Sequence, residues 1–240
     1  AVVIDEAHEL TSRITQAATD ELLPADVDRA AKRSQRHVEG DQALELGDAG
    51  ETLRVAMGEM QPGRIDQPPD ALRAALVLVR DAARACLSAY PRADSSSEAD
   101  AGMPQAKGAV QELFATAERM AAFSDADVLW LAEGGDRIPP RLCVAPLQVW
   151  GPMRDKLLSD KVVVFTSATL RLGGDFSTVA SSFGLRTSEL LLDGSEAQRS
   201  DDVLPWRGLD ISSPSDHAQQ AVPYAAKHPP PPGHGWLVKA

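Results

Sequence analysis

The sequence opens with Ala1-Val2-Val3-Ile4-Asp5-Glu6-Ala7-His8, an apolar run that ends on two adjacent carboxylates. This run, with its three β-branched residues, predicts a strand buried on both faces, as in the centre of a parallel sheet. In open α/β sheets the ligand binds beyond the carboxyl ends of the strands. Unpaired carboxylates are costly to bury, but there they suit a divalent cation and a water that must lose a proton. Asp5 is therefore the predicted Mg²⁺ ligand, directly or through water, and Glu6 the predicted catalytic base.

A second apolar run, Lys161-Val162-Val163-Val164-Phe165-Thr166-Ser167-Ala168-Thr169-Leu170, ends on small hydroxyl residues. The first stretch alone would also suit an ordinary strand exit with a capping acid. Both stretches in this order, each at the end of a buried strand, resemble motifs II (DEAH) and III (TSAT) of superfamily 2 helicases. The resemblance implies a role in coupling the ATP site to nucleic acid for His8, Ser167, Ala168 and Thr169.

Length and charge limit the remaining function classes. With 240 residues and 43% hydrophobic content, the chain can form one large domain, or one domain with an insertion, around a substantial core. A net charge of −11 and a pI near 4.9 argue against a free-standing basic nucleic-acid binder, so any DNA contact must be local. No apolar run approaches the roughly 20 residues of a membrane span, and the N-terminus lacks a basic region. We therefore expect a soluble cytoplasmic protein without a membrane partner.

The two cysteines, Cys86 and Cys143, lie far apart and form no C-x-x-C pair. Neither a zinc site nor an iron–sulfur cluster can therefore be built from this chain alone. Reduced thiols are the simplest interpretation. Cys86 falls on the apolar face of a predicted helix, which indicates a small buried hydrophobe.

Between the two motifs the sequence predicts mainly helices, with one hairpin near the end. The predicted helices start near Leu10 and Ala25 and run over 42–60, 70–90, 110–121 and 149–158. A mobile loop is expected from Arg92 to Lys107, because this stretch is polar and small. The hairpin pairs Val128–Leu131 with Arg141–Ala145.

Two features in this middle part each have a functional and a structural interpretation. Arg29, Lys32, Arg33 and Arg36 fall at i, i+3, i+4 and i+7, which makes a basic stripe: either a solvated helix face or a surface that contacts DNA phosphates. Trp130 could stack on a base, although an aromatic residue inside a strand is more often part of the core.

The long separation of the two motifs narrows the resemblance. Neighbouring parallel strands are usually joined by a much shorter connection, so this one must contain a domain of its own. A mainly helical insertion at this point resembles the arch of the XPD and DinG family of iron–sulfur helicases. Three further stretches are similar to the DinG branch: Ala145–Val149, Phe176–Gly184 and Trp206–Pro214, although Ser215 stands where the family has an aromatic residue.

The resemblance implies an α/β fold, in which a partial RecA-like P-loop NTPase parallel sheet is interrupted by a helical, arch-like insertion. Its implied divisions are the motif II strand (1–9), the insertion (10–125), the return to the first RecA-like domain (126–172) and the start of the second (173–240). It also implies an ATP-dependent 5′-to-3′ DNA helicase of repair or replication. Such an enzyme uses ATP, Mg²⁺ and a 4Fe-4S cluster on single-stranded or forked DNA.

The departures from the family pattern are equally specific. The sequence contains no G-x-x-x-x-G-K-[ST] phosphate loop, no four-cysteine segment and no late arginine motif. We therefore expect a fragment from the middle of a helicase that is inactive alone. Two alternatives stay open at this point: a non-enzymatic module that keeps the arch as an interaction surface, and a DEAH-box RNA helicase, against which the insertion counts. ATP turnover would separate the enzyme from the module.

Overall fold

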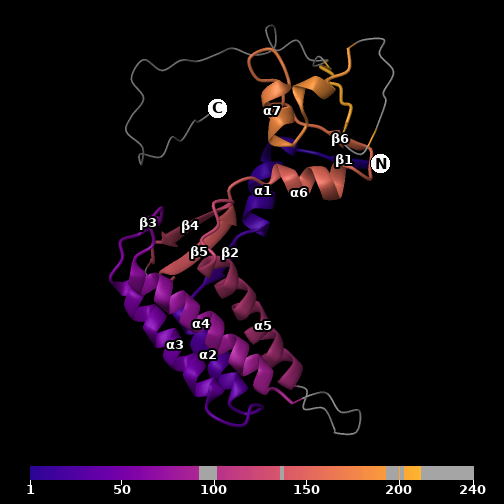
Figure 1. Ribbon diagram of the computed structural model, residues 1–240. Helices are drawn as coiled ribbons and strands as arrows, with labels where there is room; N and C mark the ends of the chain where they lie inside the picture. The colour runs from indigo at the N-terminus through magenta and orange to yellow at the C-terminus, as the bar shows by residue number, and fades with distance from the viewer. Residues whose placement is uncertain (92–101, 136–137, 193–199, 201–202, 212–240) are drawn as a thin grey trace, which may run out of the picture. The chain divides into compact units, whose positions relative to one another are not determined.

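The computed structural model describes residues 1–91, 102–135, 138–192, 200 and 203–211 (Figure 1). The described residues up to Trp206 form one compact unit, and residues 207–211 lie outside it. The described part contains two sheets: a two-stranded parallel sheet of β1 (Val2–Ile4) and β6 (Val163–Phe165), and a four-stranded antiparallel sheet. The chain is therefore α/β, as predicted.

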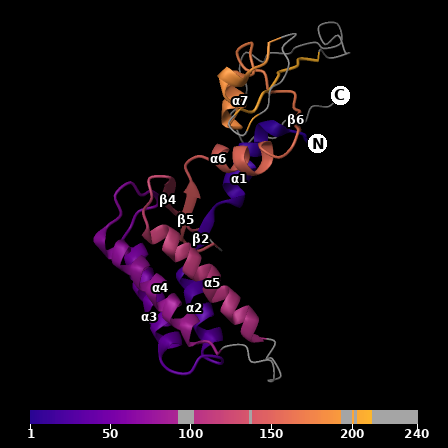
Figure 2. The same cartoon turned by 45° about the vertical axis from the view of Figure 1, so that its right-hand side comes forward.

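Four helices, which lie between the two motif strands in the sequence, pack side by side as a bundle (Figures 1 and 2). They are α2 (Pro24–Ser34), α3 (Gln42–Gly58), α4 (Asp70–Ala89) and α5 (Gly102–Ala121). The apolar face predicted for the third of them is confirmed, because its inward positions are fully buried. On α4 these are Leu72, Ala75, Leu76, Val79, Ala83 and Cys86.

Helices α2 and α3 approach each other closely because one glycine allows it. A Cβ atom on Gly50 would lie 3.0 Å from Val27, on the facing helix. That contact is tighter than side chains normally make. The glycines that weaken the helical signal over 42–60 thus do not prevent α3 from forming, since burial of Leu46 and Leu53 offsets their backbone entropy.

The antiparallel sheet covers one end of this bundle (Figure 1). Its strand order is β2 (Asp20–Leu22), β5 (Arg141–Pro146), β4 (Asp127–Ala132) and β3 (Gly63–Arg64). The β4–β5 hairpin is confirmed. Strands β2 and β3 come before the domain boundary predicted at residue 125, whereas their partners β5 and β4 come after it. The sheet therefore joins residues from both sides of that predicted boundary.

Arg119 of α5 fastens this sheet to the bundle. Its guanidinium donates to the Asp20 carboxylate at 2.7 Å, to the Asp127 carboxylate at 2.6 Å and to the Ala18 carbonyl at 2.9 Å. One side chain thus bonds to three segments: the start of β2, the start of β4 and the residue after the end of α1 (Leu10–Ala17). A partly buried arginine with three partners fixes these three segments relative to one another.

The parallel strands have a much smaller core. It consists of Ala7, Met153 and Phe183, and the Phe165 ring stacks on Phe183 with centroids 4.3 Å apart. The surrounding elements are short, and the predicted 149–158 helix is divided between an α-helical and a π-helical turn. They are η1 (Ala7–Glu9), α1, α6 (Trp150–Met153), η2 (Arg154–Leu158), α7 (Ser177–Ser182) and η3 (Thr187–Glu189).

A buried ion pair holds the segments around this small core together. The guanidinium of Arg154 donates to both carboxylate oxygens of Glu189, at 2.9 and 2.5 Å, and to the Gly184 carbonyl at 2.8 Å. Burial alone would raise the pKa of Glu189, but the hydrogen bonds from Arg154 and from the N–H groups of Arg186 and Leu204 outweigh it and lower the pKa to about 2. Glu189 is therefore charged at neutral pH.

The prediction that the motif strands are buried on both faces was wrong. Val3 is 68% exposed, Val162 64% and Val164 47%. The reason is the width of the sheet: within the described residues β1 and β6 pair only with each other, and one face of the pair carries no covering layer. An apolar run indicates that a strand favours a buried position, but it does not show that another element packs on the strand and buries it.

The loop predicted over 92–107 was also wrong in part. Residues 92–101 lie outside the described part of the chain, but residues 102–107 form the first turns of α5. Pro104 is tolerated there because the first turn of a helix needs no N–H donor, and Ala106 is buried against the bundle. The predicted family stretch around Ser213 and Ser215 lies outside the described residues.

No helix in the described part is long and apolar enough for a membrane crossing.

Candidate functional site

The two predicted motifs meet at the carboxyl ends of the parallel strands. Strand pairing sets Ile4 opposite Phe165, and the ladder continues past both strands through Thr166 N–H to Ile4 O at 2.9 Å and Ala7 N–H to Thr166 O at 3.0 Å. Because β1 and β6 run in the same direction, the residues that follow them emerge at the same edge. Side chains 161 residues apart in sequence thereby come into hydrogen-bonding contact.

Asp5 is fixed by its neighbours on both strands. Its Oδ1 accepts a hydrogen bond from Thr166 Oγ1 at 2.7 Å and another from the N–H of Glu6 at 3.0 Å. The bond from Thr166, followed by the one from Glu6, lowers the pKa of Asp5 below its usual range. Asp5 is therefore an exposed, ionised carboxylate whose orientation is set by strand β6.

Ser167 is the centre of a second polar cluster. Its Oγ lies 2.8 Å from His8 Nδ1 and 3.2 Å from Glu6 Oε2, and His8 Nδ1 lies 3.2 Å from the same Glu6 oxygen. Thr169 joins through its N–H and its hydroxyl, both 3.4 Å from Ser167 Oγ. A shift of the 167–169 segment would therefore change the hydrogen bonding of the Glu6 carboxylate directly.

The backbone at Glu6 is in a left-handed conformation, with φ 50° and ψ 42°. Only one other non-glycine residue of the described chain, Phe123, has a positive φ. Such a conformation costs on the order of 1 kcal/mol for a residue with a Cβ and persists where its surroundings impose it. Here it turns the chain sharply from β1 into η1, which leaves Asp5 and Glu6 exposed and buries Ala7 in the small core.

Sequence comparison supplies the family context. No family model matches the chain. Over 97% of its length, however, the chain is 35% identical to proteins described as ATP-dependent helicase DinG from Mycobacterium tuberculosis and Mycobacterium bovis. This sequence is related to DinG. It spans about a third (34%) of the length of these DinG proteins. Because the match extends through nearly the whole chain, the likeness to DinG does not rest on the two short motifs alone.

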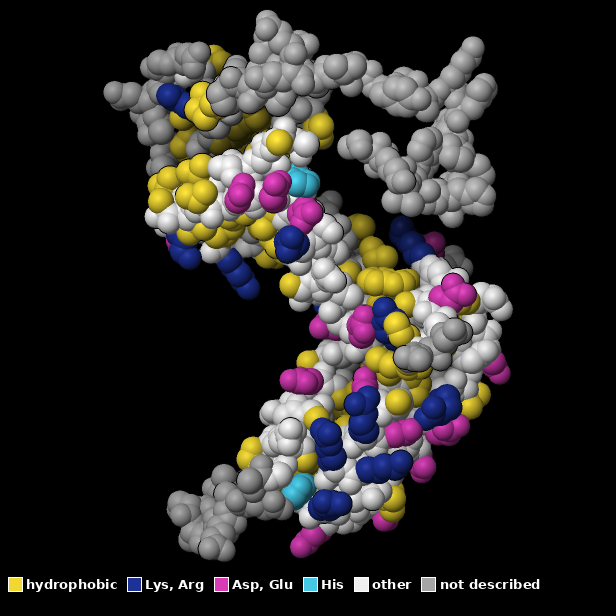
Figure 3. Space-filling model, turned by 180° about the vertical axis from the view of Figure 1, so that it is seen from behind, with side chains coloured by type: hydrophobic (Ala, Val, Ile, Leu, Met, Phe, Trp, Pro, Cys, Tyr) yellow, Lys and Arg dark blue, Asp and Glu magenta, His cyan; other side chains and the backbone are white. Residues whose placement is uncertain are grey.

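The remaining predicted residues of this DinG-like chain are placed less directly. Ala168 lies between Ser167 and Thr169 and has no polar side-chain atom, so it can contribute only its backbone. Arg29, Lys32 and Arg33 are exposed on α2, but Arg36 follows the end of that helix, so the predicted stripe is one residue shorter on the helix. Arg29 is paired with Asp26. Figure 3 shows Lys and Arg side chains gathered on one face of the bundle, with acidic side chains beside them.

The donor set at Asp5 and Glu6 fits a hydrated Mg²⁺ ion. Mg²⁺ keeps several water ligands and is usually held by one or two carboxylates together with substrate phosphates. Within the described residues no group of three or more His, Cys, Asp and Glu side chains forms a complete cage. Asp5 Oδ1 is occupied by its two donors, whereas Oδ2 has no hydrogen-bond partner in that part of the chain. One free carboxylate oxygen is what a water-rich ion of this kind requires.

The cysteines do not fit an iron–sulfur cluster. Cys86 is buried in α4 and Cys143 in β5, and both are free thiols. Burial raises the pKa of both thiols, so neither is a ready thiolate ligand. The buried-hydrophobe interpretation of Cys86 is confirmed.

One site residue was missed. Thr166 was assigned no role, although its hydroxyl contacts Asp5. The available signal was its position, because the first residue after β6 must lie beside the first residue after β1 if the two strands are parallel neighbours.

Proposed function

We propose that this chain is part of an ATP-dependent DNA helicase that translocates 5′ to 3′ on single-stranded or forked DNA, in cytoplasmic DNA repair or replication. The observation that carries the proposal is the joined network of the two motifs, Asp5 to Thr166 and Glu6 to Ser167 and His8. The DinG relatives support the class of enzyme, since their name describes an ATP-dependent helicase. The two parallel strands are the beginning of a RecA-like sheet in this proposal.

We assign the following roles, which the contacts of these side chains support. Asp5 would hold the hydrated Mg²⁺, whose charge, when bound, stabilises the phosphates during transfer. Glu6 orients the attacking water and accepts its proton, and its carboxylate is exposed and can reach solvent. Thr166 keeps Asp5 in place. Ser167, with His8 and Thr169, links the position of the β6 end to Glu6, so that nucleic acid and hydrolysis can influence each other.

The bundle and its sheet serve as the arch-like insertion in this proposal. Lys32 and Arg33 on α2 have no ion-pair partner within the described residues, and they would contact DNA phosphates together with Arg29 and Arg36. The chain lacks the phosphate loop on which nucleotide affinity depends in P-loop enzymes. We therefore expect the 240-residue chain alone to hydrolyse no ATP.

The test is a Glu6→Gln substitution in a protein that joins this sequence to a phosphate loop. Steady-state ATP hydrolysis should fall by about 10² to 10⁴, because a general base contributes about that much to rate. Nucleotide binding, measured by fluorescence titration, should stay nearly intact, since the amide keeps the size of the side chain. Glu9→Gln is the matched control: Glu9 is an exposed acid nearby that pairs only with Arg13 among described residues. Wild-type turnover in Glu6→Gln would contradict the assignment.

A further inference from the structure

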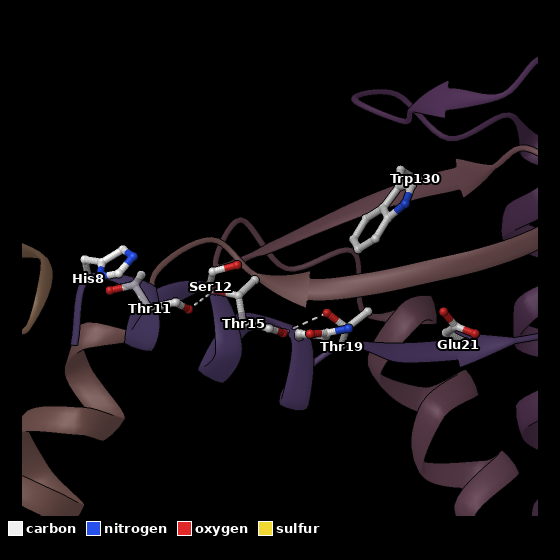
Figure 4. A pocket seen from close by; sticks show the side chains of 8 residues that line it. His8, Thr11, Ser12, Thr15, Thr19, Glu21 and Trp130 are labelled. Atoms are coloured by element: carbon white, nitrogen blue, oxygen red, sulfur yellow. Dashed lines mark hydrogen bonds between the residues drawn. The ribbon is translucent and has the colours of Figure 1, made fainter. Parts of the chain in front are cut away.

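A second functional feature lies beside the proposed hydrolysis site. An open groove of about 730 Å³ runs between α1 and the antiparallel sheet. Figure 4 shows its lining: His8, Thr11, Thr15 and Thr19 on the side of η1 and α1, and Glu21 and Trp130 on the side of the sheet. His8 belongs both to this groove and to the cluster around Ser167. A ligand at the His8 end of the groove would therefore touch a residue of the proposed ATP site.

The wall formed by α1 and the turn after it is polar and carries three threonines. Thr11 and Thr15 lie on one face of α1, about 6 Å apart along its axis, and Thr19 follows the end of the helix. The hydroxyl protons of Thr15 and Thr19 are already committed to the carbonyls of Thr11 and Thr15, at 2.9 and 2.7 Å. Their oxygens keep lone pairs for a ligand, and their methyl groups add apolar surface.

The opposite wall carries a partly exposed aromatic ring. Along β4, Leu129 and Leu131 are buried in the core of the bundle, so the alternation of a strand turns Trp130 to the other face. Strand register sets Cys143 opposite Trp130, and Glu21 opposite Cys143. Trp130 is therefore not the core residue that strand aromatics usually are. Its indole lies on an open sheet face that looks toward α1.

The charges of the groove exclude one kind of contact. Among the residues that the structure describes, its lining contains no Lys or Arg, and Glu21 is already paired with Arg141 at 2.8 Å. Phosphate groups bind where cations neutralise them, so the backbone of a nucleic acid gains little here. A nucleobase fits better, because its flat face can stack on an indole while its N–H edge donates to hydroxyl and carboxylate oxygens.

We infer that this groove binds unpaired bases of a single-stranded nucleic acid, with one base stacked on Trp130 and the sugar-phosphate backbone outside. The inference rests on the proposed function, which requires such a strand, and adds where its bases are held. His8 provides the connection to hydrolysis, because it contacts the groove and hydrogen-bonds to Ser167. The basic residues of α2 are on a different element and would meet phosphates instead.

The test uses a fluorescently labelled oligothymidylate and the 240-residue chain, with binding followed by fluorescence anisotropy. Trp130→Ala should weaken binding by about 5- to 100-fold, the range expected for loss of one base-stacking contact. Trp130→Phe should retain most of the affinity, because it keeps an aromatic face. Trp150→Ala removes another partly exposed indole, outside the groove, and should have no effect. Circular dichroism checks that each variant is folded.

A second variant covers the case in which Trp130→Ala fails to fold. Ser12 is exposed and lines the groove, so Ser12→Glu adds a negative charge there without disturbing a core. It should weaken oligonucleotide binding several-fold, whereas Ser88→Glu, at an exposed position of α4, should not. An oligonucleotide carrying 5-iodouracil should photocrosslink to the peptide that contains Trp130.

Three outcomes would overturn the inference: no oligonucleotide binding by the wild-type chain, unchanged binding in Trp130→Ala and Ser12→Glu, or crosslinks only at other peptides. These results are separate from the hydrolysis test. Loss of ATP turnover in Glu6→Gln together with unchanged oligonucleotide binding in Trp130→Ala would contradict base binding in the groove but support the proposed helicase function.

Discussion

The bundle with its antiparallel sheet and the region around the two motif strands are built in opposite ways. The bundle has a continuous apolar core to which all four helices and the sheet contribute. The motif region is built on a cluster of three buried apolar residues and leaves strand residues such as Val3 and Val164 exposed. Burial of apolar surface is the main source of stability, so the two regions should differ strongly in it. The residues of the proposed chemistry belong to the less stable one.

The motif region compensates with directed polar contacts. Arg154 and Glu189 form a two-pronged ion pair, Thr166 holds Asp5, and Ser167 joins Glu6 to His8. Such contacts add little net stability, but the Arg154–Glu189 pair is costly to break one partner at a time, because the other partner stays buried. Mutations confined to one region can therefore separate the contribution of apolar burial from that of directed polar contacts.

The largest effect on stability is expected from Arg154→Met. It leaves the Glu189 carboxylate buried without its cation, which typically costs about 3–5 kcal/mol. Hydrogen–deuterium exchange should accelerate over residues 177–192 while residues 72–87 stay protected. The double variant Arg154→Met with Glu189→Gln should recover much of the loss. Equal acceleration in both segments would mean that the two regions unfold as one unit.

A truncated core residue in the bundle should destabilise the bundle and not the motif region. Leu76 is fully buried on α4, and Leu76→Ala should lower the free energy of unfolding by about 2–5 kcal/mol. Leu78→Ala on the same helix is the control, since Leu78 is 48% exposed and its loss should cost under about 0.5 kcal/mol. Urea unfolding monitored by helical circular dichroism measures both. If the two variants lost similar amounts of unfolding free energy, Leu76 would not lie on an inward face of α4.

Acid should affect the motif region before the bundle. The folded-state pKa of Glu189 is depressed from 4.5 to about 2, so the protein binds fewer protons at this site when folded than when unfolded. The associated stability is complete above pH 4.5 and is lost as the pH falls toward 2. The protection of residues 177–192, relative to the intrinsic exchange rate at each pH, should fall in that interval. The Glu189→Gln variant should lack this part of the pH dependence, and an unchanged profile would show that another group is responsible.

The smallest effects are expected at two helical glycines. Gly108 of α5 has open space around it, so Gly108→Ala should stabilise the bundle by up to about 1 kcal/mol through helix propensity. Gly50→Ala gains the same propensity but places its Cβ 3.0 Å from Val27, and it should be neutral or destabilising. Thermal unfolding compares the two. If Gly50→Ala stabilised the chain equally, α2 and α3 would not be in close contact.

How far the sequence predicts this structure differs between the same two regions. The face of α4 and the β4–β5 hairpin follow from periodicity, because their apolar residues meet partners nearby in sequence. The meeting of Glu6 and Ser167 was expected only from the paired motifs and the resemblance. The exposure of Val3 and the groove side of Trp130 could not be foreseen, since both depend on which layers cover a sheet. Residue patterns encode a preference for burial, but they do not show which tertiary contacts bury the residue.

The pairing of Asp20 with Val144 has a consequence for the order of folding. Closing a chain over 161 residues to join Asp5 and Thr166 carries an entropy cost that grows with the logarithm of the loop length. Once the bundle and its sheet have formed, β2 and β5 lie side by side, and only the short segments on either side of them remain to be ordered. The insertion thus acts as a folding template: it shortens the effective loop, and β1 and β6 can find each other late and quickly. A bundle that folds slowly would delay the appearance of the active site by the same time.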